Sequence, residues 1–428
     1  MSTAPPRIEV RPLPPPQTRF LLLLGLPALA LSVAITVVSA YAPPLVAELS
    51  SPAVAGLIIG AEGVFALIVP IAVGSRSDRT RSRWGSRLPY LVAGGGLAAV
   101  ALALIPFAGS LPVIALGLCA FYLGYFAYYA PYRAMYPDCV DPRFTGRALG
   151  LQSTLREVGL GVALVGGSLV FALWQPLAFL IASGILVAGT AVFVARVRDP
   201  SRGTMPEHDP GPGDALRQGA WRDTIGVMRR RPDVRRLLVA NALWEFAQAA
   251  LKAFIVLFLT VGLGRSAAFG SIVFALVAVV AVAAALIGGR LVDQRGYRRL
   301  LVPATVIYGI GALAPALTQS PAVLLVVPLV AFGAALTMSL SYAWLASLMA
   351  DEPHGLAAGL YGVSQGAGIV LGPAVAGVAV EVLRPAFEGT AGYAAVFVVA
   401  AAAVLLSLLF VARVPDPRRT AVPDRAAP

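Results

Sequence analysis

The sequence predicts an all-α membrane protein with twelve transmembrane helices in two pseudo-symmetric six-helix bundles, both termini being cytoplasmic. Three observations predict this fold class. The chain is 58% hydrophobic and 13% charged, whereas a soluble domain is about 25% charged. It contains twelve long apolar runs. The runs fall into two halves of six, and a similar charged motif follows the second run of each half.

Each apolar run is long enough to cross a bilayer, because a hydrocarbon layer of ~30 Å takes about 20 residues of helix. Backbone polar groups must be satisfied internally in lipid, so runs of this length are expected to be helical. The runs cover 20–41, 53–74, 88–108, 111–136, 146–173, 175–196, 236–262, 267–289, 299–318, 321–349, 356–384 and 390–413.

Basic residues are concentrated in the loops on one side of the predicted membrane. The chain has 33 lysines and arginines and a net charge of +12. With both termini in the cytoplasm, only Arg265 and Arg384 fall in external loops, while Arg133, Arg156 and Lys252 fall within spans. This is the positive-inside distribution, and it sets the orientation. The bilayer therefore accounts for the positive charge, and no nucleic acid is expected as a partner.

Composition shifts divide the chain into five parts. Proline-rich polar ends predict disordered tails, and the Pro- and Gly-rich gap in the middle predicts a linker. Within this gap Trp221, Ile225 and Met228 follow helical spacing and predict a short amphipathic helix. The parts are a cytoplasmic tail (1–18), an N-terminal six-helix bundle (19–196), a cytoplasmic linker (197–235), a C-terminal six-helix bundle (236–413) and a second tail (414–428).

The two halves share matching sequence features. The first charged motif covers 74–87 and the second covers 289–299. Gly146-Arg-Ala-Leu-Gly150 opens the fifth span, and Gly355-Leu-Ala-Ala-Gly359 opens the eleventh at a similar offset. Two six-span repeats with a site between them are typical of secondary transporters.

The second motif fits a known loop signature. Gly289-x-Leu291-x-Asp293-x-x-Gly296-x-Arg298-Arg299 resembles the cytoplasmic loop motif of the major facilitator superfamily, and the resemblance covers essentially the whole chain. It implies two bundles that rock about a central site. The cytoplasmic gate residues that it implies are Gly74, Asp78, Arg79, Gly85, Arg87, Gly289, Asp293, Gly296, Arg298 and Arg299.

Two further stretches resemble one branch of that superfamily. Ser77-Asp78-Arg79-Thr80-Arg81-Ser82-Arg83-Trp84-Gly85 is similar to the loop of sucrose transporters and of the glycoside–pentoside–hexuronide symporters. Pro131-Tyr132-Arg133-Ala134-Met135-Tyr136-Pro137-Asp138 resembles the junction of their fourth and fifth spans. The Gly-Pro pair that drug–proton antiporters carry in the fifth span stands here in the eleventh, as Gly372-Pro373. The resemblance thus favours import of a sugar or glycoside.

Asp78 follows the cytoplasmic end of the second span, where a carboxylate opposes the dipole of its own helix. It therefore favours an arginine or the start of another helix, and the superfamily plan puts the start of the eleventh helix nearby. We expect Asp78 to latch the halves together on the cytoplasmic side, and Asp293 to act in the same way toward the fifth span. The alternative is that Asp78 is an anionic spacer in a positive loop.

Ionisable side chains inside spans are costly and are functional candidates. Glu62 lies mid-span among small residues that permit close helix approach. It is a candidate proton carrier or, alternatively, a structural hydrogen-bond partner. In the seventh span Asn241, Glu245, Gln248 and Lys252 form one polar stripe, and Lys252 is the only lysine of the chain. It is a candidate contact for substrate or coupling ion, or a structural partner of Glu245.

Polar and aromatic residues of four other spans complete the candidate site. In the fifth span, Arg156 is a candidate substrate ligand that Glu157 neutralises; structural pairing is the alternative. The tyrosines of the fourth span share one helical face, suited to sugar stacking or to packing. The proton-coupling candidates are Glu62, Glu157, Glu245 and Lys252; the cavity candidates are Tyr125, Tyr129, Tyr132, Gln152, Arg156, Asn241, Gln248, Tyr342, Tyr361 and Gln365.

The sequence carries no pattern that indicates an enzyme. It has no phosphate-binding Gly-rich loop ending in Lys-Ser/Thr, and Cys119 and Cys139 lie about 30 Å apart along one helix. No cofactor or metal is therefore expected. We expect a monomeric, proton-coupled transporter of a small polar solute in the bacterial cytoplasmic membrane, with sodium as the alternative coupling ion. The alternatives in function are a proton-coupled exporter of drugs or metabolites, a lipid flippase and a non-transporting solute receptor.

Overall fold

The computed structural model describes residues 15–77, 84–140, 145–197, 228–320, 325–349 and 354–416, together with 80, 82, 226 and 323. The described residues form helices and connecting loops, as the hydropathy pattern predicts. Eleven helices are long and apolar enough to cross a membrane, and up to twelve if the bent pair at the C-terminal end is one span. The chain is thus an all-helical, multi-pass membrane protein.

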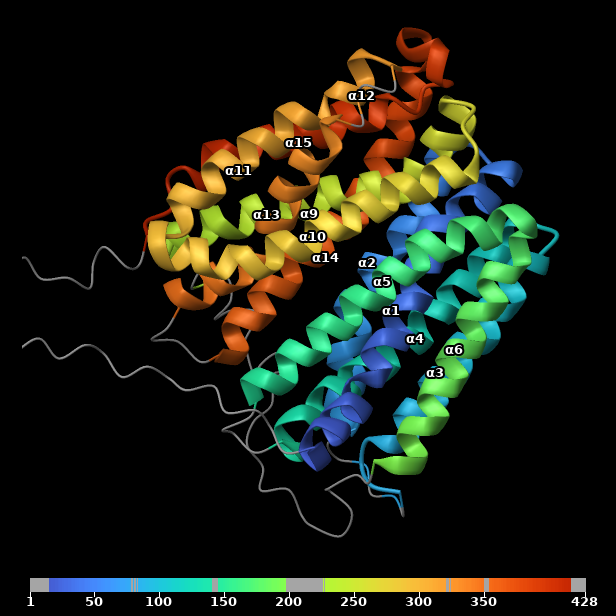
Figure 1. Ribbon diagram of the computed structural model, residues 1–428, viewed down its shortest axis with the longest axis vertical. Helices are drawn as coiled ribbons and strands as arrows, with labels where there is room; N and C mark the ends of the chain where they lie inside the picture. Colours follow the sequence, from blue (N-terminus) through green and yellow to red (C-terminus); the bar gives the residue numbers. More distant parts are fainter. Residues whose placement is uncertain are drawn as a thin grey trace, which may run out of the picture.

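Six long helices come from the first half of the chain and the remainder from the second (Figure 1). The first set is α1 (Pro15–Leu49), α2 (Pro52–Ser77), α3 (Leu88–Leu104), α4 (Leu111–Cys139), α5 (Thr145–Leu173) and α6 (Gln175–Arg196). The second set is α9 (Pro232–Leu257), α10 (Ala267–Arg295), α11 (Tyr297–Ala312), α12 (Ala314–Leu317), α13 (Val327–Leu348), α14 (His354–Val382) and α15 (Ala395–Val411). Short η1 (Ile105–Phe107), η3 (Phe258–Gly262) and η5 (Arg384–Thr390) extend α3, α9 and α14.

Two segments of the chain differ from the predicted tails. α1 begins at Pro15, within the segment 1–18 that was expected to be a tail. At the other end, Val414 is fully buried and the Pro415 carbonyl accepts a hydrogen bond from Trp344 Nε1 at 3.3 Å. The apolar side chain and the available indole donor explain why the chain packs against the bundle here. The expected amphipathic helix of the linker lies largely outside the described residues.

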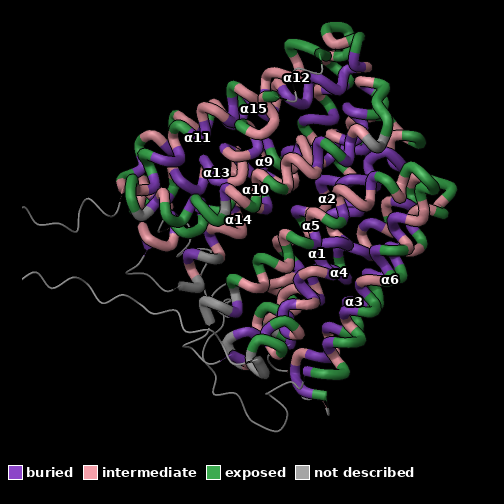
Figure 2. The backbone as a smooth tube through the Cα atoms, viewed as in Figure 1, coloured by how far each residue is buried: buried purple, intermediate pink, exposed green. Residues whose placement is uncertain are grey.

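The outer faces of the helices are apolar, as contact with lipid requires. Large side chains such as Leu116, Leu173 and Leu286 are at least 70% exposed. Figure 2 shows buried residues on the inner faces of each set of helices and exposed residues on the outer faces. The bilayer supplies the solvent for these exposed side chains.

The two sets of helices are joined at one end and diverge toward the end at which α1 begins and α15 ends (Figure 1). We call the end at which the two sets are joined the closed end. We call the end at which α1 begins and α15 ends the termini end. At the closed end, one apolar core runs from the first half into the ends of α9 and α14, including Phe254 and Val380. Near the termini end, the core around Leu301 and Trp344 belongs to the second half alone.

Helices α2 and α14 form the tightest contact between the halves. A Cβ at Gly56 would overlap the Pro373 carbonyl oxygen, and one at Gly377 would overlap the Pro52 carbonyl oxygen. Small residues permit this approach of backbones within a membrane. The contact continues as far as Gly366, whose Cβ would lie 3.7 Å from the Leu67 Cβ.

The same face of α14 loses its neighbours one turn nearer the termini end. Gly362 is four residues before Gly366, so both lie on one side of the helix. A Cβ at Gly362 meets nothing within 4 Å. The halves have therefore separated at this level.

A second contact closes the same end between α5 and α10. Ser168 and Ser271 are buried and their hydroxyls are hydrogen-bonded to each other. The Ser271 hydroxyl also donates to the Val165 carbonyl at 3.2 Å. Backbone and hydroxyl contacts, rather than ion pairs, thus hold the closed end among the described residues.

Candidate functional site

The polar stripe of α9 faces α14 in the middle of the bundle. The Asn241 amide donates to the Ser364 hydroxyl at 2.9 Å, and Gln365 Nε2 donates to Glu245 Oε1 at 3.0 Å. Asn241 and Glu245 are buried, at 1% and 7% exposure. Gln248, two turns from Asn241 on the same stripe, is exposed. The stripe is therefore held at one end by α14 and is open at the other.

Glu62 of α2 is the carboxyl that the first half contributes. Its Oε2 lies 3.5 Å from the Ser39 hydroxyl, which makes a shorter 2.7 Å bond to the Ile35 carbonyl. A contact of 3.5 Å is weak, so Ser39 holds Glu62 loosely. Glu62 and Glu245 also interact electrostatically with each other. The two halves thus bring their carboxyls to a common region.

Lys252 lies within electrostatic reach of both carboxyls. Across the described residues, its ammonium has neither an ion pair within 4.0 Å nor a hydrogen bond. The alternative of a direct ion pair with Glu245 is therefore not observed. Lys252 is half-buried, two turns nearer the closed end than Glu245.

Arg156 of α5 projects between the halves. It forms an ion pair with the adjacent Glu157 at 2.9 Å, with side-chain exposures of 59% and 31%. Adjacent helical residues point about 100° apart, so the long arginine side chain must bend toward its partner. Arg156 interacts electrostatically with Tyr361 and Glu245 of the other half. Gln152, one turn away, is half-buried.

The tyrosines of α4 divide into two groups. Tyr125 and Tyr129 stack with centroids 5.9 Å apart, and both interact electrostatically with Arg156. Tyr132 instead donates to the Leu24 carbonyl at 2.8 Å and lies 2.9 Å from the Tyr136 hydroxyl. Tyr132 is fully buried against α1. Of the three candidate tyrosines, the structure therefore brings Tyr125 and Tyr129 to the central site, and Tyr122 of the same helix interacts electrostatically with Glu62.

The second half contributes two more phenols. The Tyr361 hydroxyl lies 3.1 Å from the Ser341 hydroxyl, and its ring meets the Tyr342 ring edge-on with centroids 5.2 Å apart. Tyr361 is half-buried and Tyr342 is exposed. These groups offer hydroxyls and a ring edge on the side of the site opposite Tyr125 and Tyr129.

Two serines at the site were not among the sequence candidates. They are Ser39 and Ser341, each a small hydroxyl inside an apolar run, whereas Ser364 was a weaker candidate of the eleventh span. A serine in such a run also bonds readily to its own helix, as Ser39 does to Ile35. Sequence alone therefore gives no signal that separates Ser39 and Ser341 from other serines.

The expected gate residues lie at the termini end. Asp78 and Arg79 lie outside the described residues, as does the side chain of Asp293. Gly74 and Gly289 have open space around them, and Gly85 and Gly296 adopt positive φ, 104° and 80°. Arg87 donates to the Ala134 carbonyl, and Arg298 and Arg299 are exposed.

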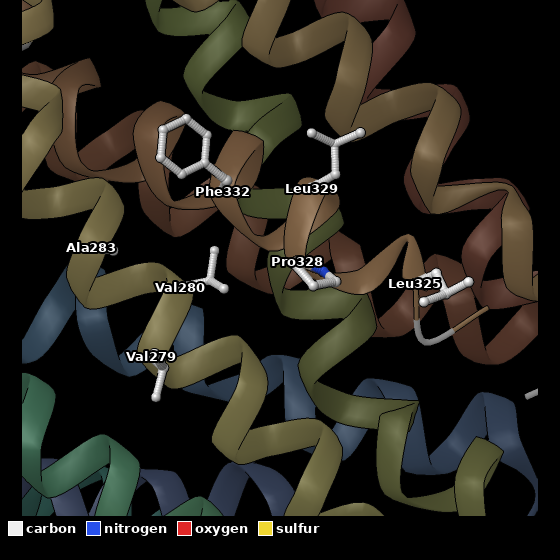
Figure 3. Close-up of a pocket in the computed structure, with 7 residues that line it drawn as sticks. All are labelled: Val279, Val280, Ala283, Leu325, Pro328, Leu329 and Phe332. Carbon is white, nitrogen blue, oxygen red and sulfur yellow. The ribbon is translucent and has the colours of Figure 1, made fainter. Parts of the chain in front are cut away.

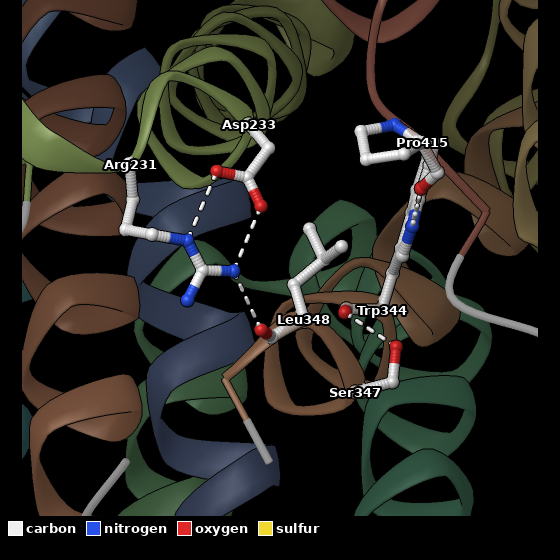
Figure 4. A network of polar contacts seen from close by, with 6 residues as sticks. All are labelled: Arg231, Asp233, Trp344, Ser347, Leu348 and Pro415. Carbon is white, nitrogen blue, oxygen red and sulfur yellow. Dashed lines mark hydrogen bonds and ion pairs between the residues drawn. The ribbon is translucent and has the colours of Figure 1, made fainter. Parts of the chain in front are cut away.

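Gly296 also lies against the segment that follows α15. A Cβ there would overlap the Asp416 carboxylate. Nearby, the Arg231 guanidinium bonds to the Asp233 carboxylate at 2.8 Å and to the Leu348 carbonyl at 2.9 Å (Figure 4). These contacts tie the termini ends of α9 and α13 together.

An apolar pocket lies between α10 and α13 (Figure 3), and its lining includes none of the candidate site residues. Its lining is Val279, Val280, Ala283, Leu325, Pro328, Leu329 and Phe332. It offers no polar side chain to orient a solute. The polar groups between the halves remain the candidate site.

Solved structures with the same fold are transporters. The chain superposes on an inward-facing bacterial homologue of the human lysosomal transporter Spinster with a TM-score of 0.77, at 18% identity over 97% of this chain and 100% of that one. On a D-xylose–proton symporter it superposes with a TM-score of 0.72, at 14% identity over 94% of this chain and 99% of that one. On the nucleoside transporter NupG it superposes with a TM-score of 0.70, at 13% identity over 92% of this chain and 97% of that one. No curated protein sequence matches significantly.

The sequence profile of the Major Facilitator Superfamily matches residues 22–281 and again 237–428. The two matches together cover nearly the whole chain and overlap over 237–281. These relatives are transporters and not enzymes. The chain is therefore a multi-pass membrane transporter that belongs to the Major Facilitator Superfamily.

Proposed function

We propose that the protein is a proton-coupled importer of a small polar solute, a sugar or glycoside-like molecule, that works by alternating access as a monomer in the bacterial cytoplasmic membrane. The observation that carries this proposal is the meeting of Glu62 and Glu245, one from each half, near Lys252. They lie between the closed end and the termini end. The surroundings of groups placed there change when one end opens and the other closes.

The orientation follows from the basic loops. With the termini end in the cytoplasm, the structure represents an inward-open state. Closing that end and parting the α2–α14 contact would expose the same site to the outside. The gate motifs support this: Asp78 would latch the termini end in the outward-open state, and Asp293 would act in the same way toward α5.

Proton coupling follows from the chemistry of the carboxyls. A carboxylate between membrane helices is costly unless it is paired or protonated. Glu62 has only a weak neutral contact, and Glu245 has one neutral donor. Protonation of either carboxyl would lower the free-energy cost of closing the site off from water while the open end changes. The arrangement supports protons as the coupling ion, with sodium as the alternative.

Two sets of groups support a polar solute. Tyr125 and Tyr129 offer a stacked aromatic face, and Tyr361 and Ser341 offer hydroxyls across the site. Rings and hydroxyls together suit sugars. The D-xylose–proton symporter with the same fold performs a function of this class, and the loop motifs favour the glycoside–pentoside–hexuronide branch.

The test is uptake of labelled sugars and glycosides into proteoliposomes, with and without an inward proton gradient. Gradient-driven accumulation of one solute would support the proposal. Replacing the proton gradient with a sodium gradient distinguishes the two coupling ions. Absence of uptake, combined with proton-dependent extrusion of a lipophilic dye from cells that express the protein, would replace import with export.

A further inference from the structure

Lys252 carries a charge of the central site that has no direct partner among the described residues. Across the described residues it has no ion pair within 4.0 Å and no hydrogen bond. It is also the only lysine among 33 basic residues. An ammonium group inside a membrane protein is costly without a partner. Its position therefore requires an explanation beyond packing.

The neighbouring carboxyls are engaged with neutral groups of their own halves. Glu245 accepts from Gln365 at 3.0 Å, and Glu62 faces Ser39 at 3.5 Å. A lysine that served only as their counter-ion would be expected to contact one of them directly, since a short ion pair offsets its desolvation. The structure instead leaves the ammonium within reach of both carboxyls and bound to neither.

Two other cations lie near the site. Arg156 is paired with Glu157 at 2.9 Å, and these two charges cancel. Arg133 lies over the Tyr129 ring, 5.6 Å from its centroid, on the side of Tyr129 nearer the termini end. Tyr308 and Tyr361, which interact electrostatically with Glu245, are phenols. The charge at the level of the carboxyls therefore depends on the three groups that interact with one another, Lys252, Glu62 and Glu245.

The sign of that charge changes with proton binding. With both carboxyls ionised, the three groups sum to −1, and with both protonated they sum to +1. In the protonated state the uncompensated charge is the Lys252 ammonium. A cationic solute would be repelled in that state, whereas an anionic one would be attracted.

We infer that the transported solute carries a carboxylate, which pairs with the Lys252 ammonium when Glu62 and Glu245 hold protons. This inference rests on the proposed transport function and specifies its substrate class as a small organic acid. Lys252 is seven residues beyond Glu245 along α9, about 10 Å nearer the closed end. The carboxylate would therefore bind at the deep end, and the body of the solute would face Tyr125, Tyr129 and Tyr361.

The test compares solutes that differ only in the carboxylate. Gluconate and glucitol share a hydroxylated chain, and benzoate and benzyl alcohol share an aromatic ring. Binding to the purified full-length protein is measured by calorimetry at low pH, and uptake is measured in proteoliposomes with an inward proton gradient. We expect one of the two acids to bind about tenfold or more tightly than its alcohol.

Variants at Lys252 identify the partner of the carboxylate. Lys252→Met keeps the length and removes the charge, and it should reduce the preference for the acid about tenfold. Lys252→Arg should keep part of that preference. Arg196→Met, at an exposed position in the last turn of α6, removes one positive charge far from the site and should leave the preference unchanged. Thermal unfolding of each variant separates lost binding from lost structure.

The outcomes separate this inference from the proposed function. Accumulation of neutral sugars under the gradient, with no preference for either acid, would keep proton-coupled import and overturn the inference. Acid binding that depends on Lys252 without gradient-driven uptake would keep the inference and overturn proton coupling. Binding of neither acid, or an acid preference that Lys252→Met leaves intact, would also overturn it.

Discussion

The two ends of the contact between α2 and α14 differ in how closely the backbones approach. At the closed end, Gly56 and Gly377 leave no room for a Cβ beside the carbonyl oxygens of the partner helix. Toward the termini end, Gly362 has no neighbour within 4 Å. Both regions are rich in small residues, so composition alone does not close an end. Contact depends on the angle between the halves, and small residues let either angle form.

Between these ends lie the two carboxyls of the central site. Glu62 is on the same helix as Gly56, and Glu245 is on the helix that packs against α14 through Gly368 and Gly372. A change of charge at this level therefore acts on the helices that make the closed-end contact. This connects proton binding with the choice of open end.

Removing the carboxyls between the two ends should have the largest effect. In Glu62→Gln and Glu245→Gln, we expect gradient-driven accumulation to fall about tenfold or more, because the coupling of proton and solute is lost. Exchange of labelled for unlabelled solute without a gradient should persist. Both are measured in proteoliposomes. Glu388→Gln, an exposed carboxyl of η5, serves as the matched control, and wild-type accumulation in both site variants would contradict the coupling role.

The second prediction concerns the contact between α2 and α14 at the closed end, which one added methyl group should weaken. Gly377→Ala should destabilise the closed contact by about 1–3 kcal/mol, because the new Cβ overlaps the Pro52 carbonyl and the backbones must part. Gly362→Ala on the same helix is the control, since its Cβ enters open space. In a background without native cysteines, the yield of a disulfide between Ser168→Cys and Ser271→Cys reports closure. Equal yields in the two alanine variants would show that α2–α14 packing does not hold this end closed.

The third prediction concerns the termini end, where we expect Asp78 to hold the two halves together in the outward-open state. Asp78→Asn should slow uptake several-fold, because the outward-open state loses a stabilising contact that is worth about 1 kcal/mol. Distances between spin labels at the termini end should shift toward the separated state. Wild-type uptake together with wild-type distances would show that Asp78 is only an anionic spacer.

The smallest effect separates the two groups of tyrosines. Tyr129→Phe should raise KM about two- to fivefold with little change in stability, because it removes a hydroxyl at the central site. Tyr132→Phe should leave KM unchanged and lower the free energy of unfolding by about 1 kcal/mol, since its hydroxyl bonds to the Leu24 carbonyl. Uptake kinetics and thermal unfolding measure the two effects, and the reverse pattern would place Tyr132 in the site instead.

Much of the fold could be predicted from sequence, because the bilayer imposes length and hydropathy on each span. The ends were less predictable. Helix α1 begins at Pro15, and Val414 is buried. The burial of Val414 depends on what the neighbouring helices offer, such as the indole of Trp344 that donates to Pro415, and hydropathy does not report such a partner.

The candidate site was predictable where one helix carries it. The spacing of Asn241, Glu245 and Lys252 puts them on one stripe. Their partners, Ser364 and Gln365, come from α14, and a pattern within α9 cannot identify them. The tyrosine face of α4 shows the same limit. Tyr125 and Tyr132 share a helical face and are both buried, but only the surrounding helices decide which hydroxyl bonds to α1 and which lies near Arg156.

The central claim is that the two ends open in turn around the Glu62–Lys252–Glu245 site. Pulsed EPR distances test it most directly, with one label pair at the closed end, Leu49→Cys with Val382→Cys, and one at the termini end, Arg76→Cys with Arg290→Cys. We expect lowered pH with a transported solute to lengthen the first distance and shorten the second, and Glu62→Gln to abolish the dependence on pH. Two distances that change in the same direction, or that stay fixed while uptake proceeds, would contradict the account.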